Sequence, residues 1–415
     1  MKYAIVTFGC RVNQADSLRI EEELRSRGAE AVPPDEADLV VVNTCSVTAT
    51  ADQGARQTIR RVARENPGVR IVATGCYATR APDAVAALPN VVKVVRNDEK
   101  LALAAALELH TAVRFGEGDG PCGAVIEPGL GGRTAFTLRV QTGCDECCSY
   151  CIIPSTRGHG RSVPLDLVRR EVARVAAAGF KEIALTGVHL GSYGRDLDPP
   201  SSLLALLRAL AQVDADVVYR ISSLEPMDCT GGIVDLVASS GGRFAPHFHL
   251  PLQHASDRML RLMRRPYTAS YYAALVRDLA DRLPHASIGT DIIVGFPGET
   301  EDDFAANIAY LAGSPLSHVH VFPYSDRPGT SAAAMGDKVD GAVIRARGRR
   351  LREVGAELAT RFREAQVGSV RPALTVSDGA TVVTDNYLKL PIPPGRRRNE
   401  RLQVLVTDVG PSLPV

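Results

Sequence analysis

The sequence lacks an excess of either charge, and it lacks an apolar run long enough to span a bilayer. Its 48 lysines and arginines nearly match its 47 aspartates and glutamates, so the formal net charge is only +1. A chain this close to neutrality shows no global sign of nucleic-acid binding, and any such contact must come from local basic patches. The first residues, MKYAIVTFGC, have the pattern of a β-strand rather than of a secretory leader. We therefore expect a cytoplasmic protein that does not contact a membrane.

A disulfide framework is also disfavoured, because the nine cysteines are odd in number and no secretory leader precedes them. Three of them, Cys144, Cys148 and Cys151, have the spacing C-x3-C-x2-C, with Tyr150 directly before the last thiol. An iron–sulfur cubane contains four irons, and a thiolate normally holds each one. Three thiolates leave one iron open to a chelating cosubstrate. The spacing resembles that of the radical S-adenosylmethionine (SAM) superfamily.

Zinc is the alternative ligand for this loop, because Cys147 divides it into two C-x2-C pairs. Structural zinc usually takes its pairs from separated hairpins, and the adjacent thiols of Cys147 and Cys148 would share one tetrahedral site poorly. We therefore predict an iron–sulfur cluster in which Cys147 is not a ligand.

Three further cysteines end three apolar runs in the N-terminal part of the chain. The runs span residues 3–10, 38–45 and 69–76 and end at Cys10, Cys45 and Cys76. They are β-branched and unalternated, as in parallel strands buried on both faces, and helical patterns at residues 15–27 and 49–65 separate them. Because the carboxyl ends of parallel strands share one edge of a sheet, we expect the three thiols to lie together. This arrangement favours a second three-thiolate cluster; buried core cysteines are the alternative.

The central part of the chain alternates strand and helix. Strand patterns lie at residues 136–141, 182–186, 217–222, 247–251, 288–294 and 318–322. Helical patterns lie at residues 164–178, 201–213, 233–239, 257–264, 269–283 and 301–311. Six βα units predict a parallel sheet curved into a partial barrel, with the cysteine loop at its carboxyl end. A Gly- and Pro-rich stretch before it, residues 112–132, has the composition of a linker and contains Cys122.

Several residues after the predicted strands are candidates for SAM binding. On the resemblance to the superfamily, the second strand leads to the SAM amino group, and hydroxyls and a carboxylate after the third can bind a ribose. The candidates are Tyr150, Thr186, Gly187, Ser223, Glu225 and Gln253. A purely structural role is the alternative for each of them, and the sequence does not identify a catalytic side chain.

The C-terminal part begins with a basic helical pattern over residues 343–366. Its arginines are Arg345, Arg347, Arg349, Arg350 and Arg352. Short alternating strands follow over residues 368–410, with Arg396, Arg397 and Arg398 at a turn. These arginines are candidates for phosphate contact, and a solvated basic face is the alternative. We expect Tyr387 to be packed rather than stacked on a base.

Together these motifs resemble the radical SAM methylthiotransferase family nearly from end to end, and most closely its MtaB type. The matching segments are GCRVNQADS (9–17), NTCSVT (43–48), TGCYA (74–78), LTGVHLGSYG (185–194), RISSLE (220–225), HVFPYSDRPGT (320–330) and TDNYLKL (384–390). The chain departs from the family at His254-Ala255-Ser256, where Ser-Gly-Ser is usual, at Cys147, and in a short C-terminal segment.

The resemblance implies an α/β protein with three domains. These are an N-terminal parallel α/β domain at 1–111, a partial (βα)6 radical SAM barrel at 133–335 and a small TRAM-like RNA-binding β-barrel at 368–415. The linker 112–132 and a basic helical connector at 336–367 join them.

The implied activity is transfer of a methylthio group to C2 of N6-threonylcarbamoyladenosine at position 37 of tRNA. It implies SAM and two [4Fe–4S] clusters as cofactors and an electron donor such as flavodoxin or ferredoxin, and it leaves the sulfur donor unidentified. We expect a monomer. The alternatives are action on isopentenyladenosine tRNA, action on a ribosomal-protein aspartate, and a zinc-stabilised RNA-binding module without catalysis.

The threonylcarbamoyl group carries a carboxylate, whereas isopentenyl is apolar, so the two substrates need different pockets. A buried carboxylate without a partner costs several kcal/mol, about 3 or more. Arg157 and Arg220, near predicted strand ends, are the candidates to bind it.

Overall fold

The computed structural model describes residues 1–100, 103, 126–129, 132–377 and 379–407. Most of the predicted linker, with Cys122, and the chain after residue 407 lie outside the described residues. Within the described part, no helix has both the length and the apolar character needed to cross a membrane.

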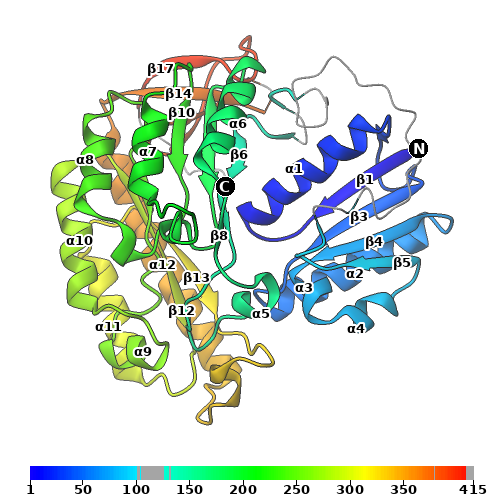
Figure 1. Cartoon of the computed structure of the whole chain (residues 1–415). Coiled ribbons are helices and arrows are strands. Elements are labelled where there is room, and N and C mark those ends of the chain that lie inside the picture. Colours follow the sequence, from blue (N-terminus) through cyan, green and yellow to red (C-terminus); the bar gives the residue numbers. More distant parts are fainter. Residues whose placement is uncertain (101–102, 104–125, 130–131, 378, 408–415) are drawn as a thin grey trace.

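The N-terminal part is a five-stranded parallel sheet in the order β2-β1-β3-β4-β5 (Figure 1). Its strands are β1 Lys2–Thr7, β2 Glu30–Ala31, β3 Leu39–Thr44, β4 Arg70–Gly75 and β5 Val91–Val95. Its helices are α1 Arg11–Ser26, α2 Ala49–Glu65, α3 Cys76–Arg80 and α4 Pro82–Ala86. The three predicted strands are present, and the central strand β3 is buried along its whole length, as its unalternated sequence predicts. The first helix begins at Arg11 and not at residue 15, so it starts directly after Cys10.

The central part is a partial barrel of six parallel strands with helices on the outside (Figure 1). The strands are β6 Phe136–Arg139, β9 Glu182–Thr186, β10 Val218–Ile221, β11 His247–His249, β12 Ser287–Val294 and β13 His318–Pro323. Two three-stranded sheets meet at the parallel bridge of Tyr219 with Phe244. The helices are α6 Leu165–Ala177, α7 Leu203–Ala211, α8 Gly231–Ser239, α9 Asp257–Leu262, α10 Ala269–Arg282 and α11 Glu301–Gly313. All six predicted strands and all six predicted helices are therefore present, although α9 and α10 both follow β11.

The central cysteines lie in a short segment between the first barrel strand, β6, and helix α6. It consists of the hairpin β7 Gln141–Thr142 and β8 Arg161–Ser162, with the helix α5 Ile153–Arg157 inside it. Two-residue strands show no periodicity, so no pattern predicts this hairpin, and Gln141 falls at the end of the predicted strand 136–141.

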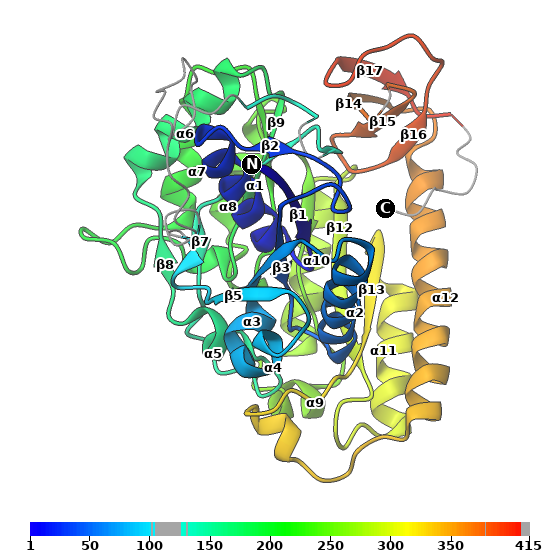
Figure 2. The same ribbon diagram turned by 90° about the vertical axis from the view of Figure 1, so that its right-hand side faces the viewer.

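The C-terminal part consists of the long helix α12 Gly341–Gln366 and a four-stranded antiparallel sheet (Figure 2). The strands are β14 Val370–Val376, β15 Thr381–Thr384, β16 Lys389–Pro391 and β17 Arg401–Leu405, in the order β16-β15-β14-β17. The helix packs against β13 and α11, and it leads directly into the sheet. The predicted helix and the predicted set of short strands are both present.

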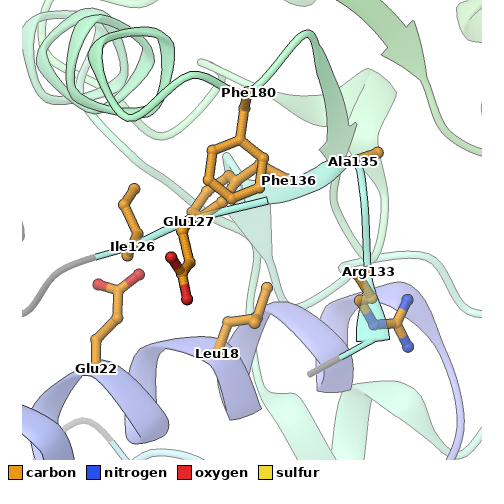
Figure 3. Close-up of a pocket in the computed structure, with 8 residues that line it drawn as sticks. All are labelled: Leu18, Glu22, Ile126, Glu127, Arg133, Ala135, Phe136 and Phe180. Carbon is orange, nitrogen blue, oxygen red and sulfur yellow. The ribbon is translucent and has the colours of Figure 1, made fainter. Parts of the chain in front are cut away.

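The N-terminal part contacts the barrel where α1 meets β6 and where α3 meets α5, and Asp52 of α2 forms a buried ion pair with Arg327 after β13. Figure 3 shows the first contact, where Leu18 and Glu22 of α1 face Phe136 and Phe180. The cavity left there measures about 10 Å³, which is room for at most one water molecule. This junction is therefore a packed interface and not a ligand site.

Candidate functional site

The three N-terminal cysteines lie together at the carboxyl edge of their sheet, as predicted. Cys10 precedes α1, Cys45 follows β3, and Cys76 is the first residue of α3. At Gly9, where φ is +92°, an added Cβ would lie 2.7 Å from both Cβ and Sγ of Cys45. Only glycine allows the backbone before Cys10 to approach Cys45 this closely.

The environment of this N-terminal triad fits a metal cluster. Burial, together with the charges of the neighbouring Cys76 and Cys10, raises the pKa of the Cys45 thiol to about 11. Three crowded thiols of this kind become thiolates readily only when a metal compensates their charge. Asn97 donates a hydrogen bond from Nδ2 to the sulfur of Cys76 over 3.6 Å. Cys10 is exposed whereas Cys45 and Cys76 are buried, so the triad is accessible from the side of Cys10.

A buried ion network lies beside the N-terminal triad and was missed by the sequence analysis. Asp16 accepts hydrogen bonds from Lys100 Nζ at 3.0 Å and Arg157 Nη2 at 3.1 Å, and it also pairs with Arg139. Burial alone would raise the pKa of Asp16, but the three cations hold it well below its usual range. Three cations share one carboxylate, so the network keeps a positive excess next to the thiols.

Arg157 therefore does not present a free cation to a substrate, which corrects one of the two predicted carboxylate contacts. Its side chain is only 3% exposed and bonds Asn13 and Asp16. Burial would lower its pKa, but Cys76, Asp16 and Cys10 raise it above its usual value. Arg157 belongs to the barrel, and its positive charge lies beside Asp16 and Cys76 of the N-terminal domain.

The second cysteine group, Cys144, Cys148 and Cys151, lies in the loop between β7 and α5. The backbone N–H of Cys151 donates to the carbonyl of Cys148 over 3.1 Å, which folds the loop into a turn. Burial raises the pKa of the Cys151 thiol to about 12 and also raises that of Cys148. Cys147, in contrast, is exposed.

Two cationic side chains support this central triad, and neither was predicted. Arg265 donates from Nη1 to the sulfur of Cys148 at 3.0 Å and also pairs with Glu225. Nδ1 of His189 lies 3.9 Å from the sulfur of Cys144. Burial alone would lower the pKa of His189, but Asp228, 2.7 Å from its Nε2, and Cys144 raise it to about 9.

The two triads lie beside the same contact between the domains. Helix α5 begins two residues after Cys151 and packs against α3, which begins at Cys76 (Figure 1). Nδ2 of Asn97 donates to the carbonyl of Thr156 in α5 over 2.9 Å and so joins the two parts beside the N-terminal triad.

The six predicted SAM contacts gather near the carboxyl ends of the barrel strands. Thr186 ends β9 with Gly187 behind it, and the ring of Tyr150 packs edge-on against Phe296. Glu225 is engaged by Arg265, next to Cys148. Gln253 has a φ of +71° and is held by backbone hydrogen bonds to β12, so its strained backbone fixes where its side chain begins.

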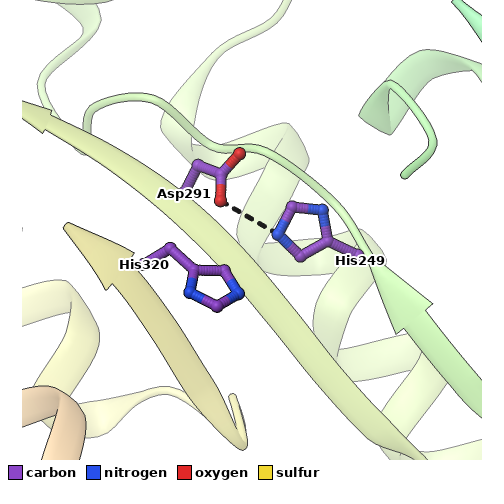
Figure 4. Close-up of side chains that lie close together, drawn as sticks. All are labelled: His249, Asp291 and His320. Carbon is purple, nitrogen blue, oxygen red and sulfur yellow. Dashed lines mark hydrogen bonds and ion pairs between the residues drawn. The ribbon is translucent and has the colours of Figure 1, made fainter. Parts of the chain in front are cut away.

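Two histidines and an aspartate lie close together on the neighbouring strands β11, β12 and β13 (Figure 4). Nδ1 of His249 and the hydroxyl of Ser223 share a hydrogen bond of 2.8 Å. Nε2 of His249 lies 2.9 Å from Oδ1 of Asp291. The ligand atoms of His249, Asp291 and His320 lie within 4.8 Å of one another. Such a set can hold a proton or a divalent cation.

Arg220, the second predicted carboxylate contact, is also committed to other partners. Its guanidinium makes two hydrogen bonds to Glu182, of 3.0 and 2.9 Å, and one of 2.9 Å to the carbonyl of Asp385. Tyr387 packs 5.0 Å above it and 4.7 Å from His247, so this tyrosine is packed as expected.

The predicted phosphate contacts at the β16–β17 turn are not equivalent. Arg396 and Arg397 are exposed, whereas Arg398 donates from Nε to the carbonyl of Ser377 over 2.8 Å. In α12, Arg347 is buried between Glu299 and Glu301 and supports the barrel. It is therefore not part of an exposed basic face.

Comparison with known proteins defines the class first. The sequence profile of the Radical SAM superfamily matches residues 138–311, and that of the Uncharacterized protein family UPF0004 matches residues 2–96. Among solved structures, the radical SAM methyltransferase TsrM from Kitasatospora setae superposes with a TM-score of 0.56 at 17% identity, over 80% of this chain and 75% of that one. The radical SAM enzyme OxsB gives 0.52 at 11%, over 85% and 56%. The fold is thus that of a radical SAM enzyme.

Curated relatives then identify the family. The threonylcarbamoyladenosine tRNA methylthiotransferase MtaB of Aquifex aeolicus is 37% identical over 94% of this chain and 96% of its own length. MtaB of Bacillus subtilis is 34% identical over 93% and 89%. The tRNA-2-methylthio-N(6)-dimethylallyladenosine synthase of Frankia casuarinae is 35% identical over 91% and 71%. The chain belongs to the radical SAM methylthiotransferase family, which confirms the predicted resemblance.

Proposed function

We propose that this chain transfers a methylthio group to C2 of N6-threonylcarbamoyladenosine at position 37 of tRNA. The observation that carries the proposal is the pair of cysteine triads beside α3 and α5, two helices that pack against each other where the domains meet. Relatives named for this activity are 32–37% identical over most of the chain.

The cofactors are two [4Fe–4S] clusters and SAM. Cys10, Cys45 and Cys76 hold one cluster, and Cys144, Cys148 and Cys151 hold the other. Tyr150, Thr186, Gly187, Ser223, Glu225 and Gln253 bind SAM at the rim. When bound, these groups supply the radical and sulfur chemistry that replacement of an unactivated C–H bond requires.

The protein's own side chains prepare this environment. Arg265 and His189 place positive charge and hydrogen-bond donors beside the central cysteines. The Asp16 network places a positive excess beside the N-terminal cysteines. The positive charge beside each triad favours the thiolate form of its cysteines, which is the form that binds iron.

The domain boundaries follow the same assignment. Residues 1–111 form the methylthiotransferase α/β domain, 112–132 the linker, 133–335 the radical SAM barrel, 336–367 the basic connector and 368–415 a TRAM-like RNA-binding domain. Arg396 and Arg397 are exposed on the last of these and contact tRNA phosphates, while Arg398 shapes the turn. The enzyme acts as a cytoplasmic monomer and takes electrons from a flavodoxin or ferredoxin.

Isopentenyladenosine tRNA is the second candidate substrate, because relatives named for dimethylallyladenosine are 31–35% identical. Anaerobically reconstituted enzyme should be incubated with SAM, a reductant and tRNA carrying either nucleoside, followed by mass spectrometry of the nucleosides. We expect methylthiolation of the threonylcarbamoyl nucleoside and essentially none of the isopentenyl one. Equal turnover, or activity only on a ribosomal protein, would contradict the substrate assignment.

A further inference from the structure

A cavity of about 360 Å³ lies where the three parts of the chain meet. Helix α1 contributes Arg11 and Gln14, the barrel interior contributes Glu182 and Arg220, and the C-terminal sheet contributes Val383. The segment before β6 closes the cavity with Arg133 and Thr134, and Tyr387 completes it on the C-terminal side. A cavity of this size accommodates a small organic substituent.

The cavity has an excess of positive charge. Its lining contains three arginines, Arg11, Arg133 and Arg220, against one carboxylate, Glu182. Since Arg220 already binds Glu182 with two hydrogen bonds, the other two arginines carry the excess.

Neither Arg11 nor Arg133 has a carboxylate partner within 4.0 Å among the residues that the structure describes. Arg11 donates from Nη2 to the hydroxyl of Tyr387 at 3.2 Å, and Arg133 donates from Nη1 to Oε1 of Gln14 at 2.8 Å. Partial burial and then the charge of Arg11 lower the pKa of Arg133, so the two guanidinium groups lie close enough to repel one another. An anion between them would relieve this repulsion.

A second observation also points to a ligand. Thr134, which lines the same cavity, is 5% exposed, and its Oγ1 has no hydrogen-bond partner among the described residues. A buried hydroxyl without a partner is costly, so a polar ligand in the cavity would satisfy it.

The cavity lies next to the N-terminal cysteine triad, which is proposed to hold a cluster. Arg11 directly follows Cys10, and Gln14 lies one helical turn further along α1. In adenine, C2 and the carbon that bears N6 are separated only by N1. A base whose C2 faces the N-terminal triad therefore directs its N6 substituent to one side of that triad, where the cavity lies.

We propose that Arg11 and Arg133 bind the carboxylate of the N6 substituent and thereby select a carboxylated adenosine over an apolar one. The inference rests on the proposed function, and it assigns the substrate specificity of the enzyme to two particular residues. Arginine suits this role, because its planar fork can bind a carboxylate with two hydrogen bonds. Thr134 donates or accepts a further hydrogen bond from the same substituent.

The test compares binding of two anticodon stem-loops to the reconstituted holoenzyme by fluorescence anisotropy. One stem-loop carries threonylcarbamoyladenosine, and the other carries its carboxamide, which has the same shape without the charge. We expect the wild-type protein to prefer the carboxylate by about tenfold or more, as is typical of a charged hydrogen-bonded pair. The ratio of the two Kd values should fall towards one in Arg11→Gln and Arg133→Gln, and Arg11→Lys should retain part of it.

Each variant is tested with both stem-loops, so a general loss of RNA affinity changes both Kd values equally and leaves their ratio unchanged. Arg19→Gln is the matched control, since Arg19 is exposed on the same helix and does not line the cavity; its ratio should equal that of the wild type. Arg11 directly follows Cys10, so Arg11→Gln can disturb cluster assembly, whereas Arg133 adjoins no cysteine proposed to bind iron. The iron content of each variant is measured alongside.

An unchanged ratio in the Arg11→Gln, Arg133→Gln double variant would overturn the inference and leave the proposed function intact. So would a wild-type protein that methylthiolates the threonylcarbamoyl nucleoside yet binds both stem-loops equally. Failure of the wild-type holoenzyme to modify that nucleoside would instead overturn the proposed function.

Discussion

At the residue scale, two adjacent cysteines in one loop have different surroundings. Cys148 is half-buried, receives a hydrogen bond from Arg265 and lies beside Cys144 and Cys151. Cys147 is exposed to solvent. Neighbouring residues in an extended loop point in different directions, so one can face a cluster while the other faces water.

Replacing these two cysteines in turn gives a sharp prediction. Each three-thiolate site takes one four-iron cluster, so the reconstituted wild-type protein should hold about eight irons. Cys148→Ala should lose about half of this iron, while Cys147→Ala should lose essentially none, as measured by iron and sulfide analysis. Equal losses in the two variants would show that the ligand assignment is wrong.

The sequence identified the candidate ligands but not the groups around them, and the reason is physical. Cysteine spacing is local, and thiols at strand ends must share one edge of a sheet. Arg265, by contrast, meets Cys148 from 117 residues away, and Arg157 meets Asp16 from 141 residues away. No periodicity encodes such pairs, because they exist only once the chain has folded. The same applies to Arg11 and Arg133.

At the element scale, the helix that follows the fifth barrel strand begins at a capping box. Thr300 precedes α11, and its side chain accepts from the N–H of Asp303 at 3.3 Å, while Asp303 Oδ2 accepts from the N–H of Thr300 at 3.0 Å. Asp303 also pairs with Arg258. These reciprocal bonds satisfy two backbone donors that the first turn would otherwise leave free.

Removing this cap should destabilise the barrel without touching the proposed site. Asp303→Ala should lower the free energy of unfolding by about 1–2 kcal/mol, observed as a lower Tm. Burial would raise the pKa of Asp303, but Arg258, Ser256 and Thr300 lower it below its ordinary value. The ionised carboxylate therefore stabilises the fold above a pH of about 4, and its contribution is lost as the pH falls towards the lowered pKa. The Tm difference between wild type and variant should shrink in acid, and a constant difference would contradict this account.

Strand length decides which elements the sequence could predict. Strands of four to eight residues, such as β9 and β12, carry a readable pattern, and the structure has them where predicted. The two-residue strands β7 and β8 carry none. They pair where the chain leaves the barrel and returns around the cysteine loop.

The β16–β17 turn yields a prediction about RNA affinity. Changing Arg396 and Arg397 to Ala should weaken tRNA binding and reduce the log–log salt slope by up to about two, roughly one unit per lost phosphate contact. Arg398→Ala is the contrasting variant, because its guanidinium bonds Ser377 and its loss should affect the turn more than the slope. A slope that is unchanged in the double variant would favour a solvated turn without RNA contact.

At the scale of the whole molecule, the contacts between domains bring together groups that the sequence keeps far apart. Arg157 of the barrel enters the N-terminal domain beside Cys76, and Arg220 of the barrel bonds the C-terminal sheet at Asp385. The order of the domains was predictable from sequence patterns, since each has its own periodicity. Their relative placement was not, because it depends on these few buried polar contacts and on the packing of α1 against β6.

This placement separates two tasks that should be separable by mutation. The variant with Ala at Cys10, Cys45 and Cys76 keeps the central triad and its supports, so it should still cleave SAM when reduced but should form no methylthio product. The variant with Ala at Cys144, Cys148 and Cys151 should do neither. Both activities are measured on one sample, by chromatography of 5′-deoxyadenosine and mass spectrometry of the nucleosides, and iron analysis should give about four irons for each variant. If the first variant still forms product, the N-terminal cysteines serve the fold of their sheet and not the chemistry, and the two triads do not work as a pair.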